Sequence, residues 1–150
     1  MEYGLIGGRL GHSYSKVIHE MLCGYRYDLC PLPTEADARA FLQRRQFKAI
    51  NVTIPYKKLV MEYCSFIDPR ARAIGAVNTV VNKNGLLYGY NTDYPGFSYL
   101  CDAHGVEFKD RTVLILAPAA PTTPPGPWPM TGARNRSIPS AAIPTPKRES

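Results

Sequence analysis

A glycine-rich segment near the start of the chain, GGRLGHSYS at 7–15, places small polar side chains where a helix is predicted to begin. Its glycines permit turns and close approaches that larger residues would block. His12, Ser13 and Ser15 supply an imidazole and two hydroxyls beside the free amides of a helix start, where a small polar ligand can bind. The alternative is a tight turn with a serine cap. The segment matches neither GxGxxG nor a P-loop.

A second polar segment, NVTIPYKK at 51–58, follows the pattern of a strand that runs into a helix. Asn51 and Thr53 share one face of the strand, because side chains alternate with a period of two. They lie at its carboxyl end, where α/β sheets bind ligands. Lys57 is predicted one turn into the helix, where the helix dipole favours a neutral amine suited to proton transfer. The alternative is that Lys57 and Lys58 are solvated surface lysines.

The segments AVNTV and GYNTDYPG add three polar residues near strand ends, Asn78, Asn91 and Asp93. Asparagine and aspartate are poor strand formers. Their positions therefore suggest polar groups directed at a shared cleft. The alternative is that Asp93 caps a helix and the asparagines form turns.

The elements that must position these residues follow from hydrophobic periodicity and capping signals. The patterns predict strands over 3–7, 25–29, 48–53, 77–82 and 86–90, and helices over 13–25, 34–45, 55–63, 68–74 and 93–104. Val17, Ile18, Met21 and Leu22 give the first helix an apolar face. Asn84-Gly85 is the strongest short signal for a hairpin. The order βαβαβα, then a hairpin and a helix, predicts an α/β domain with a mixed sheet.

Composition changes near residue 116. Residues 117–150 hold nine of the 14 prolines and half of the net charge of +6, but no Leu, Val, Phe or Tyr. Such a segment cannot bury enough apolar surface to offset chain entropy, so a disordered Pro/Arg-rich tail is predicted there.

Several function classes are disfavoured. The body of the chain has no basic run with interleaved aromatic residues, so a nucleic-acid partner is not expected. No apolar run approaches the ~20 residues of a membrane span. Cys23, Cys30, Cys64 and Cys101 fit neither a CxxC pair nor a zinc site, and the histidines lack metal-ligand spacing. With no secretory signal after Met1, free thiols and a cytoplasmic location are expected.

Four ordered motifs together resemble the substrate-binding half of shikimate dehydrogenase. They are GLIGGRLGHSYSKVIHEML, AINVTIPYKK, GAVNTV and GYNTDYPGF, and the resemblance covers roughly residues 3–116. It implies that Ser13 and Ser15 bind the carboxylate of shikimate, and that Asn51, Thr53, Asn78 and Asp93 bind its ring hydroxyls. It also implies that Lys57 and Asp93 are the catalytic pair, and that a Rossmann domain behind this half binds NADP.

The implied chemistry is the interconversion of 3-dehydroshikimate and shikimate with NADPH, in the biosynthesis of aromatic amino acids. Oxidising a secondary alcohol removes a proton from oxygen and a hydride from carbon. Lys57 is suited to take the proton, with Asp93 orienting it and the hydroxyl. The nicotinamide must take the hydride, because no side chain can. Quinate, or a related polyol acid, is an alternative substrate.

The resemblance also predicts the domain boundaries: a shikimate-binding catalytic domain at 1–112, the first strand of a Rossmann domain at 113–116 and the disordered tail at 117–150. The family would continue after Leu116 with a glycine-rich turn such as Gly-Ala-Gly-Gly-Ala. This chain has Ala-Pro-Ala-Ala-Pro at 117–121. Dropping one base from GC-rich codons for the glycine-rich peptide yields these residues, which suggests a frameshift, real or from sequencing.

Without the cofactor domain, the 150-residue chain is expected to bind substrate at most and to show no NADP-dependent turnover. Two other classes of protein stay open. One is a non-catalytic module that binds such an acid. The other is a nucleic-acid-binding protein that depends on the basic tail.

Overall fold

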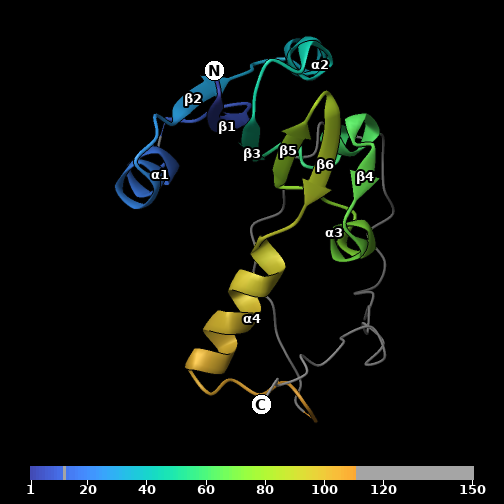
Figure 1. Ribbon diagram of the computed structural model, residues 1–150. Helices are drawn as coiled ribbons and strands as arrows, with labels where there is room; N and C mark the ends of the chain where they lie inside the picture. The colour runs from blue at the N-terminus through green and yellow to red at the C-terminus, as the bar shows by residue number, and fades with distance from the viewer. Residues whose placement is uncertain (12, 111–150) are drawn as a thin grey trace, which may run out of the picture. The chain divides into compact units, whose positions relative to one another are not determined.

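The computed structural model describes residues 1–11 and 13–110. These residues form a six-stranded mixed sheet of order β2-β1-β3-β5-β6-β4, with helices around it (Figure 1). The strands are β1 (Tyr3–Gly7), β2 (Asp28–Pro31), β3 (Ala49–Val52), β4 (Phe66–Ile67), β5 (Thr79–Lys83) and β6 (Leu86–Tyr90). The prediction of an α/β fold with a mixed sheet is confirmed.

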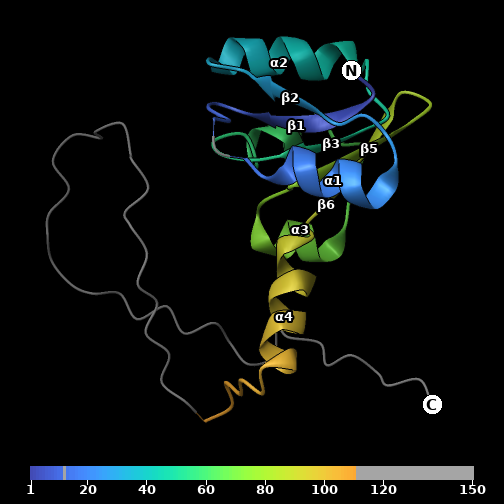
Figure 2. The same ribbon diagram turned by 90° about the vertical axis from the view of Figure 1, so that its left-hand side faces the viewer.

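The first half of the sheet is parallel. β1 pairs with β2 on one side and with β3 on the other. The crossovers contain α1 (Ser15–Cys23) and α2 (Glu35–Arg44), which lie on opposite faces of these strands in Figure 2. This placement follows from the right-handedness of both crossovers, because the connection from β1 to β2 and the connection from β2 to β3 run in opposite directions along the sheet. It brings the carboxyl ends of β1 and β3 to the same edge.

The start of α2 is fixed by a capping box, as its sequence predicts. The Thr34 hydroxyl accepts from the backbone N–H of Asp37, and the Asp37 carboxylate accepts from the backbone N–H of Thr34. Two orphan amides of the helix are therefore satisfied by side chains.

The second half of the sheet is a hairpin. β5 and β6 are antiparallel and turn at Asn84-Gly85, where both residues have positive φ angles of 53° and 83°. That geometry is the tight turn that Asn-Gly favours. β5 then pairs antiparallel with β3, which joins the two halves of the sheet. The last helices are α3 (Pro69–Ile74), capped by Asp68, and α4 (Asp93–Ala103).

The main core lies between the sheet on one side and α2, α3 and a short 3₁₀ helix at Leu59–Tyr63 on the other. Its members are buried aliphatic and aromatic side chains, among them Ile6, Leu42, Ile50, Val60, Val80 and Leu87. A smaller cluster of Leu5, Leu10 and Tyr27 lies beside the end of β1. Both clusters hold β1 and β3 in place behind the polar residues at their carboxyl ends.

The apolar face predicted for the first helix is present, but the described residues do not cover it. Val17, Ile18, Met21 and Leu22 are between 52% and 80% exposed, and α1 has no buried residue. Polar contacts hold the helix instead. Lys16 Nζ donates to Tyr27 O at 3.0 Å, and Tyr27 N donates to Glu20 Oε1 at 3.1 Å.

The helix predicted at 55–63 is wrong for its first half. Residues 54–58 form turns, and a short 3₁₀ helix, η1 (Leu59–Tyr63), follows. The carbonyl of Lys57 accepts from Val77 N at 2.8 Å, while Met61 N, its partner in an α-helix, donates to Lys58 O at 3.1 Å. Lys57 therefore lies in a turn, and the argument from an α-helix dipole does not apply to it.

Other boundaries differ by a few residues. β2 begins at Asp28 rather than Tyr25, because it pairs with β1 only from Gly4 onward. Asn78 lies just before β5, and the two-residue β4 carried no sequence signal. The predicted strand at 113–116 and tail at 117–150 lie outside the described residues, so these boundaries stay predictions. None of the helices in the described part of the chain has the length and apolarity needed to cross a membrane.

Candidate functional site

A cavity of about 570 Å³ opens where β1 and β3 end. Its lining includes the seven side chains to which the family resemblance gives a role: Ser13, Ser15, Asn51, Thr53, Lys57, Asn78 and Asp93. Asn91, which was also expected at the cleft, is absent from the lining. They come from the α1 start, the end of β3, the turn after it, the segment before β5 and the start of α4. His12, which the sequence also suggested, lies outside the described residues.

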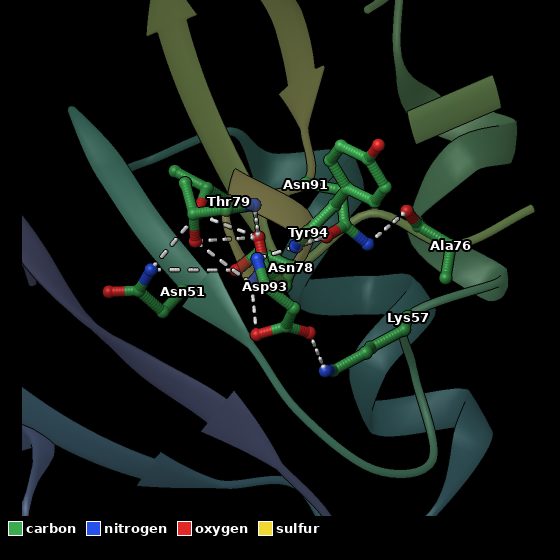
Figure 3. Close-up of polar contacts among 9 residues, drawn as sticks. Asn51, Lys57, Ala76, Asn78, Thr79, Asn91, Asp93 and Tyr94 are labelled. Carbon is green, nitrogen blue, oxygen red and sulfur yellow. Dashed lines mark hydrogen bonds and ion pairs between the residues drawn. The ribbon is translucent and has the colours of Figure 1, made fainter. Parts of the chain in front are cut away.

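Lys57 and Asp93 are in direct contact in this cavity. The distance from Lys57 Nζ to Asp93 Oδ2 is 2.6 Å, although the two residues are 36 positions apart in the chain (Figure 3). Their side chains are 31% and 61% exposed. The pair is thus accessible from the cavity while the turn at 54–58 and the start of α4 hold it together.

The start of α4 is fixed by Asn91 rather than by Asp93. Asn91 Oδ1 accepts from Asp93 N at 3.0 Å and from Tyr94 N at 3.3 Å, while Asn91 Nδ2 donates to Ala76 O at 3.0 Å (Figure 3). The buried Asn91 therefore satisfies the first amides of the helix. This leaves the Asp93 carboxylate directed to Lys57 and Asn78 instead of serving as a helix cap.

Asn78 has its side-chain hydrogen bonds within the protein. Its Nδ2 donates to Asp93 Oδ1 at 2.8 Å and to Thr92 Oγ1 at 3.0 Å. Its Oδ1 accepts from Thr92 N at 2.9 Å and from Thr79 Oγ1 at 3.0 Å. Both amide hydrogens and both lone pairs are used. Asn78 thus orients Asp93, and a ligand hydroxyl would have to exchange with one of these bonds.

Asn51 connects the site to the small core cluster. Its Oδ1 accepts from the hydroxyl of Tyr27 at 2.7 Å, and its Nδ2 donates to Thr79 Oγ1 at 3.1 Å. Burial raises the pKa of the Tyr27 phenol well above its ordinary value, so the hydroxyl keeps its proton. Tyr27 is a functional candidate that the sequence did not reveal, because its position in the predicted second strand gave no sign of a partner 24 residues away.

Ser13 and Ser15 lie at the entry to α1. Ser13 Oγ accepts from Ser15 N at 3.2 Å, and the helix has no other side-chain cap. The predicted serine cap is therefore present only as this one bond, and both serines also line the cavity. Their hydroxyl protons can reach a ligand oxygen.

Two further residues line the cavity that the sequence had not marked for it. One is Arg9, which is exposed. The other is His19, which stacks on the ring of Tyr27 at 4.2 Å between centroids. The helical spacing of His19 showed where it lies on α1 but not what the opposite strand would bring to it.

Metal chemistry finds no support in the described residues. No group of three or more His, Cys, Asp or Glu side chains in them could hold a metal ion. Their four cysteines are free, as expected. The site is therefore one of hydroxyls, amides and a single amine–carboxylate pair, which suits a small ligand with several hydroxyls and a proton to transfer. The class of protein so defined is an α/β domain with a polar cavity, in which an amine and a carboxylate are in contact.

The chain belongs to the shikimate dehydrogenase family. Residues 5–80 match the family described as "Shikimate dehydrogenase substrate binding domain". Among curated relatives, a shikimate dehydrogenase (NADP(+)) of Bacillus cereus strain G9842 is 46% identical over 122 residues, and one of Clostridium beijerinckii is 40% identical over 121. Both alignments cover 76% of this chain but only 44% and 45% of the relatives, so the chain spans about half their length.

Solved structures agree with this assignment. Shikimate dehydrogenase 1 of Peptoclostridium difficile superposes with a TM-score of 0.66 at 34% identity, over 71% of this chain and 42% of that one. A Thermus thermophilus shikimate 5-dehydrogenase, solved in complex with NADP(H) and shikimate, superposes with a TM-score of 0.62 at 32% identity, over 70% and 42%. The fold predicted from the four motifs is that of these enzymes.

Proposed function

We propose that residues 1–110 are the substrate-binding half of a shikimate dehydrogenase, whose cavity binds shikimate or 3-dehydroshikimate. The observation that carries this proposal is the convergence of four separate motifs on one cavity, with Lys57 in contact with Asp93. The relative from Thermus thermophilus that was solved with shikimate supports it, since the two folds are alike.

In this proposal each part of the ligand meets groups of matching chemistry. Ser13 and Ser15 donate to the carboxylate, and Arg9 also lines the cavity. Asn51 and Thr53 face the ring hydroxyls. A site that pairs each hydroxyl discriminates against analogues that lack one, because its own polar groups are then left unpaired.

Lys57 and Asp93 act on the alcohol that is oxidised. The amine of Lys57 takes the proton from the hydroxyl oxygen, and returns it in the reverse direction. Asp93 holds the amine in place, while Asn78 holds Asp93 through Oδ1. Two hydrogen-bonded contacts on one carboxylate limit its rotation, so the amine is kept where a ligand hydroxyl can reach it.

The described residues do not fit the dinucleotide that the relatives' names imply. A phosphate-binding turn needs glycines open to the ligand and a helix directly behind them. Here a Cβ at Gly7 would lie 2.5 Å from Thr53 Cγ2, and one at Gly8 would lie 3.2 Å from Pro55 Cδ. These glycines are packed against the β3 end, and α1 starts only at Ser15. We therefore assign no step of hydride transfer to these residues.

Binding tests the proposal directly. Calorimetric titration of the full chain with shikimate should show saturable binding at one site. The melting temperature should also rise with ligand, because a ligand concentration of 100 times Kd adds about 2.7 kcal/mol to the free energy of unfolding. A parallel titration with quinate tests the alternative substrate, because the acid with the lower Kd is the preferred ligand. The double substitution Ser13→Ala with Ser15→Ala should weaken binding at least tenfold, since both donors to the carboxylate are removed.

The matched control for the serine variant is Ser65→Ala, which removes an exposed hydroxyl outside the cavity lining. It should leave the affinity unchanged. Lack of saturable binding by the unmodified chain to either acid would overturn the proposal. Equal affinities of the serine double variant and the control would overturn the assignment of the carboxylate site.

A non-catalytic acid-binding module is the second candidate, because no side chain of the described residues can take up a hydride. It shares the binding prediction but differs in redox chemistry. A chimera that joins residues 1–110 to the remaining half of the Bacillus cereus relative decides between them. NADP-dependent oxidation of shikimate by the chimera supports the dehydrogenase, and binding without oxidation supports the module.

A further inference from the structure

A continuous chain of hydrogen bonds runs behind the cavity from Tyr27 to Asp93. It passes from the Tyr27 hydroxyl to Asn51, Thr79 and Asn78, and ends at the carboxylate that contacts Lys57. Figure 3 shows the part from Asn51 to Lys57. Each member except the Asp93 carboxylate can donate or accept, so the direction of the whole chain depends on the groups that can do only one of the two.

The anchor at one end is unambiguous. The Asp93 carboxylate only accepts, and the backbone N–H of Thr92 only donates. Asn78 contacts both, at 2.8 Å and 2.9 Å. Its Nδ2 must therefore face Asp93, and its Oδ1 must face Thr92 N.

The direction then passes to Thr79 and Asn51. Asn78 Oδ1 accepts the hydroxyl proton of Thr79, at 3.0 Å. Thr79 Oγ1 has no second proton, so it must accept from Asn51, whose Nδ2 lies 3.1 Å away. The Oδ1 of Asn51 is thereby turned toward Tyr27, which donates to it at 2.7 Å.

Little hydrogen-bonding capacity of Asn51 is left for a ligand. One Nδ2 hydrogen goes to Thr79, and the other is directed at Asn78 O, 3.5 Å away. Tyr27 uses one of the two lone pairs of Oδ1, and the second remains. The amide thus offers the cavity an acceptor and no donor.

We infer that Tyr27 is a positioning residue, which fixes the Asn51 amide so that the site accepts a hydrogen bond from a ligand hydroxyl at this point. This inference rests on the proposed function and adds a specificity rule to it. A ring hydroxyl satisfies Asn51 Oδ1, whereas a keto oxygen or an ether oxygen at the same place meets an acceptor and is rejected.

A purely structural role for Tyr27 is separable from this one. Its ring is 2% exposed, belongs to the cluster with Leu5 and Leu10, and stacks on His19. Tyr27→Phe keeps these contacts and removes only the hydroxyl. Tyr56→Phe is a matched control, because Tyr56 is also buried, at 4%, and its hydroxyl donates to Leu32 O at 2.6 Å outside the cavity lining.

Calorimetry with shikimate on the full 150-residue chain is the first measurement. Tyr27→Phe should weaken binding by about 3- to 10-fold, the factor expected from loss of one fixed hydrogen bond. Tyr56→Phe should change the affinity by less than about twofold. Equal affinities for the two variants, with the unmodified chain binding normally, would overturn the inference and leave the proposed function intact.

A double-mutant cycle shows whether Tyr27 acts through Asn51. In an Asn51→Ala background, Tyr27→Phe should cause no further loss of affinity, because the amide it positions is gone. The same loss in both backgrounds would mean that the tyrosine supports the site only structurally, and would overturn the inference.

The side-chain amide resonance of Asn51 gives a readout that needs no ligand. Tyr27→Phe should shift it and weaken its nuclear Overhauser contact to Thr79, while Tyr56→Phe leaves both unchanged. Thr79→Val, which removes the acceptor at the other end, should shift the same resonance and weaken shikimate binding similarly. If the unmodified chain fails to bind shikimate, the proposed function falls; an unchanged Asn51 resonance in Tyr27→Phe would overturn the positioning role in either case.

Discussion

At the scale of single residues, the central feature is an ion pair that contributes little to the stability of the fold. Lys57 and Asp93 are 2.6 Å apart, but both side chains are substantially exposed. Exposed pairs typically contribute 0 to ~1 kcal/mol to stability. The close contact is therefore better explained by the chemistry of the site than by the stability of the fold.

Replacing the amine tests this view. In the chimera with the cofactor half of the Bacillus cereus relative, Lys57→Met should lower kcat by about 10²- to 10⁴-fold, since it removes the proposed general base. Chemical denaturation of the full chain should show a loss of less than about 1 kcal/mol. Lys58→Met, one residue on and absent from the cavity lining, is the control and should keep both near wild type. A small change in kcat for Lys57→Met would remove Lys57 from the mechanism.

At the scale of elements, the cavity depends on how closely the loop after β1 approaches the end of β3. Gly7 is the last residue of β1, just before this loop, and its surroundings leave no room for a side chain. An added Cβ would lie 2.5 Å from Thr53 Cγ2 and 2.9 Å from Leu10 Cδ2. Thr53 is β-branched and Leu10 is buried, so neither can easily give way. The close approach sets the position of Thr53 in the site.

Gly7→Ala should therefore be destabilising by about 1–3 kcal/mol, the usual cost of overpacking. It should also weaken shikimate binding, because Thr53 is displaced. Denaturant unfolding and calorimetry measure the two effects. Gly96→Ala in α4 is the control, since a Cβ there meets no atom within 4 Å. A fully stable Gly7→Ala variant would contradict the close packing of these two segments.

The attachment of α1 should depend on pH. Hydrogen bonds from Tyr27 N and from Lys16 lower the pKa of Glu20 from its ordinary value. A carboxylate with a lowered folded-state pKa stabilises the fold above its unfolded value of about 4.3, and this contribution is lost as pH falls through the folded-state pKa.

Denaturant unfolding between pH 7 and pH 3 measures this contribution. The wild-type chain should lose stability at the acidic end, and Glu20→Gln should lose less of it over the same range, because the variant has no carboxylate to protonate. Glu107→Gln, which lies beyond α4 and away from α1, is the control and should follow the wild type. Identical pH profiles for Glu20→Gln and the wild type would show that Glu20 does not hold α1.

At the scale of the whole molecule, the composition of the chain changes after residue 116, and the domain boundaries inferred from this change stay predictions. The hypothesis of a one-base displacement before Ala117 explains why the family pattern stops there. Resequencing of the DNA that encodes 109–121 should reveal one missing base relative to the coding frame of close relatives. A verified sequence that aligns with those relatives without displacement would end the hypothesis.

The sequence by itself determined the local elements and the identity of the chemical groups. Asn84-Gly85 specified the hairpin and Thr34 the start of α2, because turn and cap geometries depend on a few neighbouring residues. The four motifs also contained the seven polar side chains of the cavity lining to which the resemblance gave a role. These signals are local in the chain, so no knowledge of distant contacts was needed to read them.

Only the tertiary structure decided how those groups combine. Val77 N donates to the carbonyl of Lys57, which lies in a turn where a helix was predicted to begin. Asn91, rather than Asp93, accepts from the first amides of α4. The direction of the Asn51 amide depends on Thr79, 28 residues away, and the hydroxyl of Tyr27 then donates to its Oδ1. Each of these outcomes is a competition for one hydrogen-bonding group between partners distant in the chain, and only the folded sheet determines which partner is within reach.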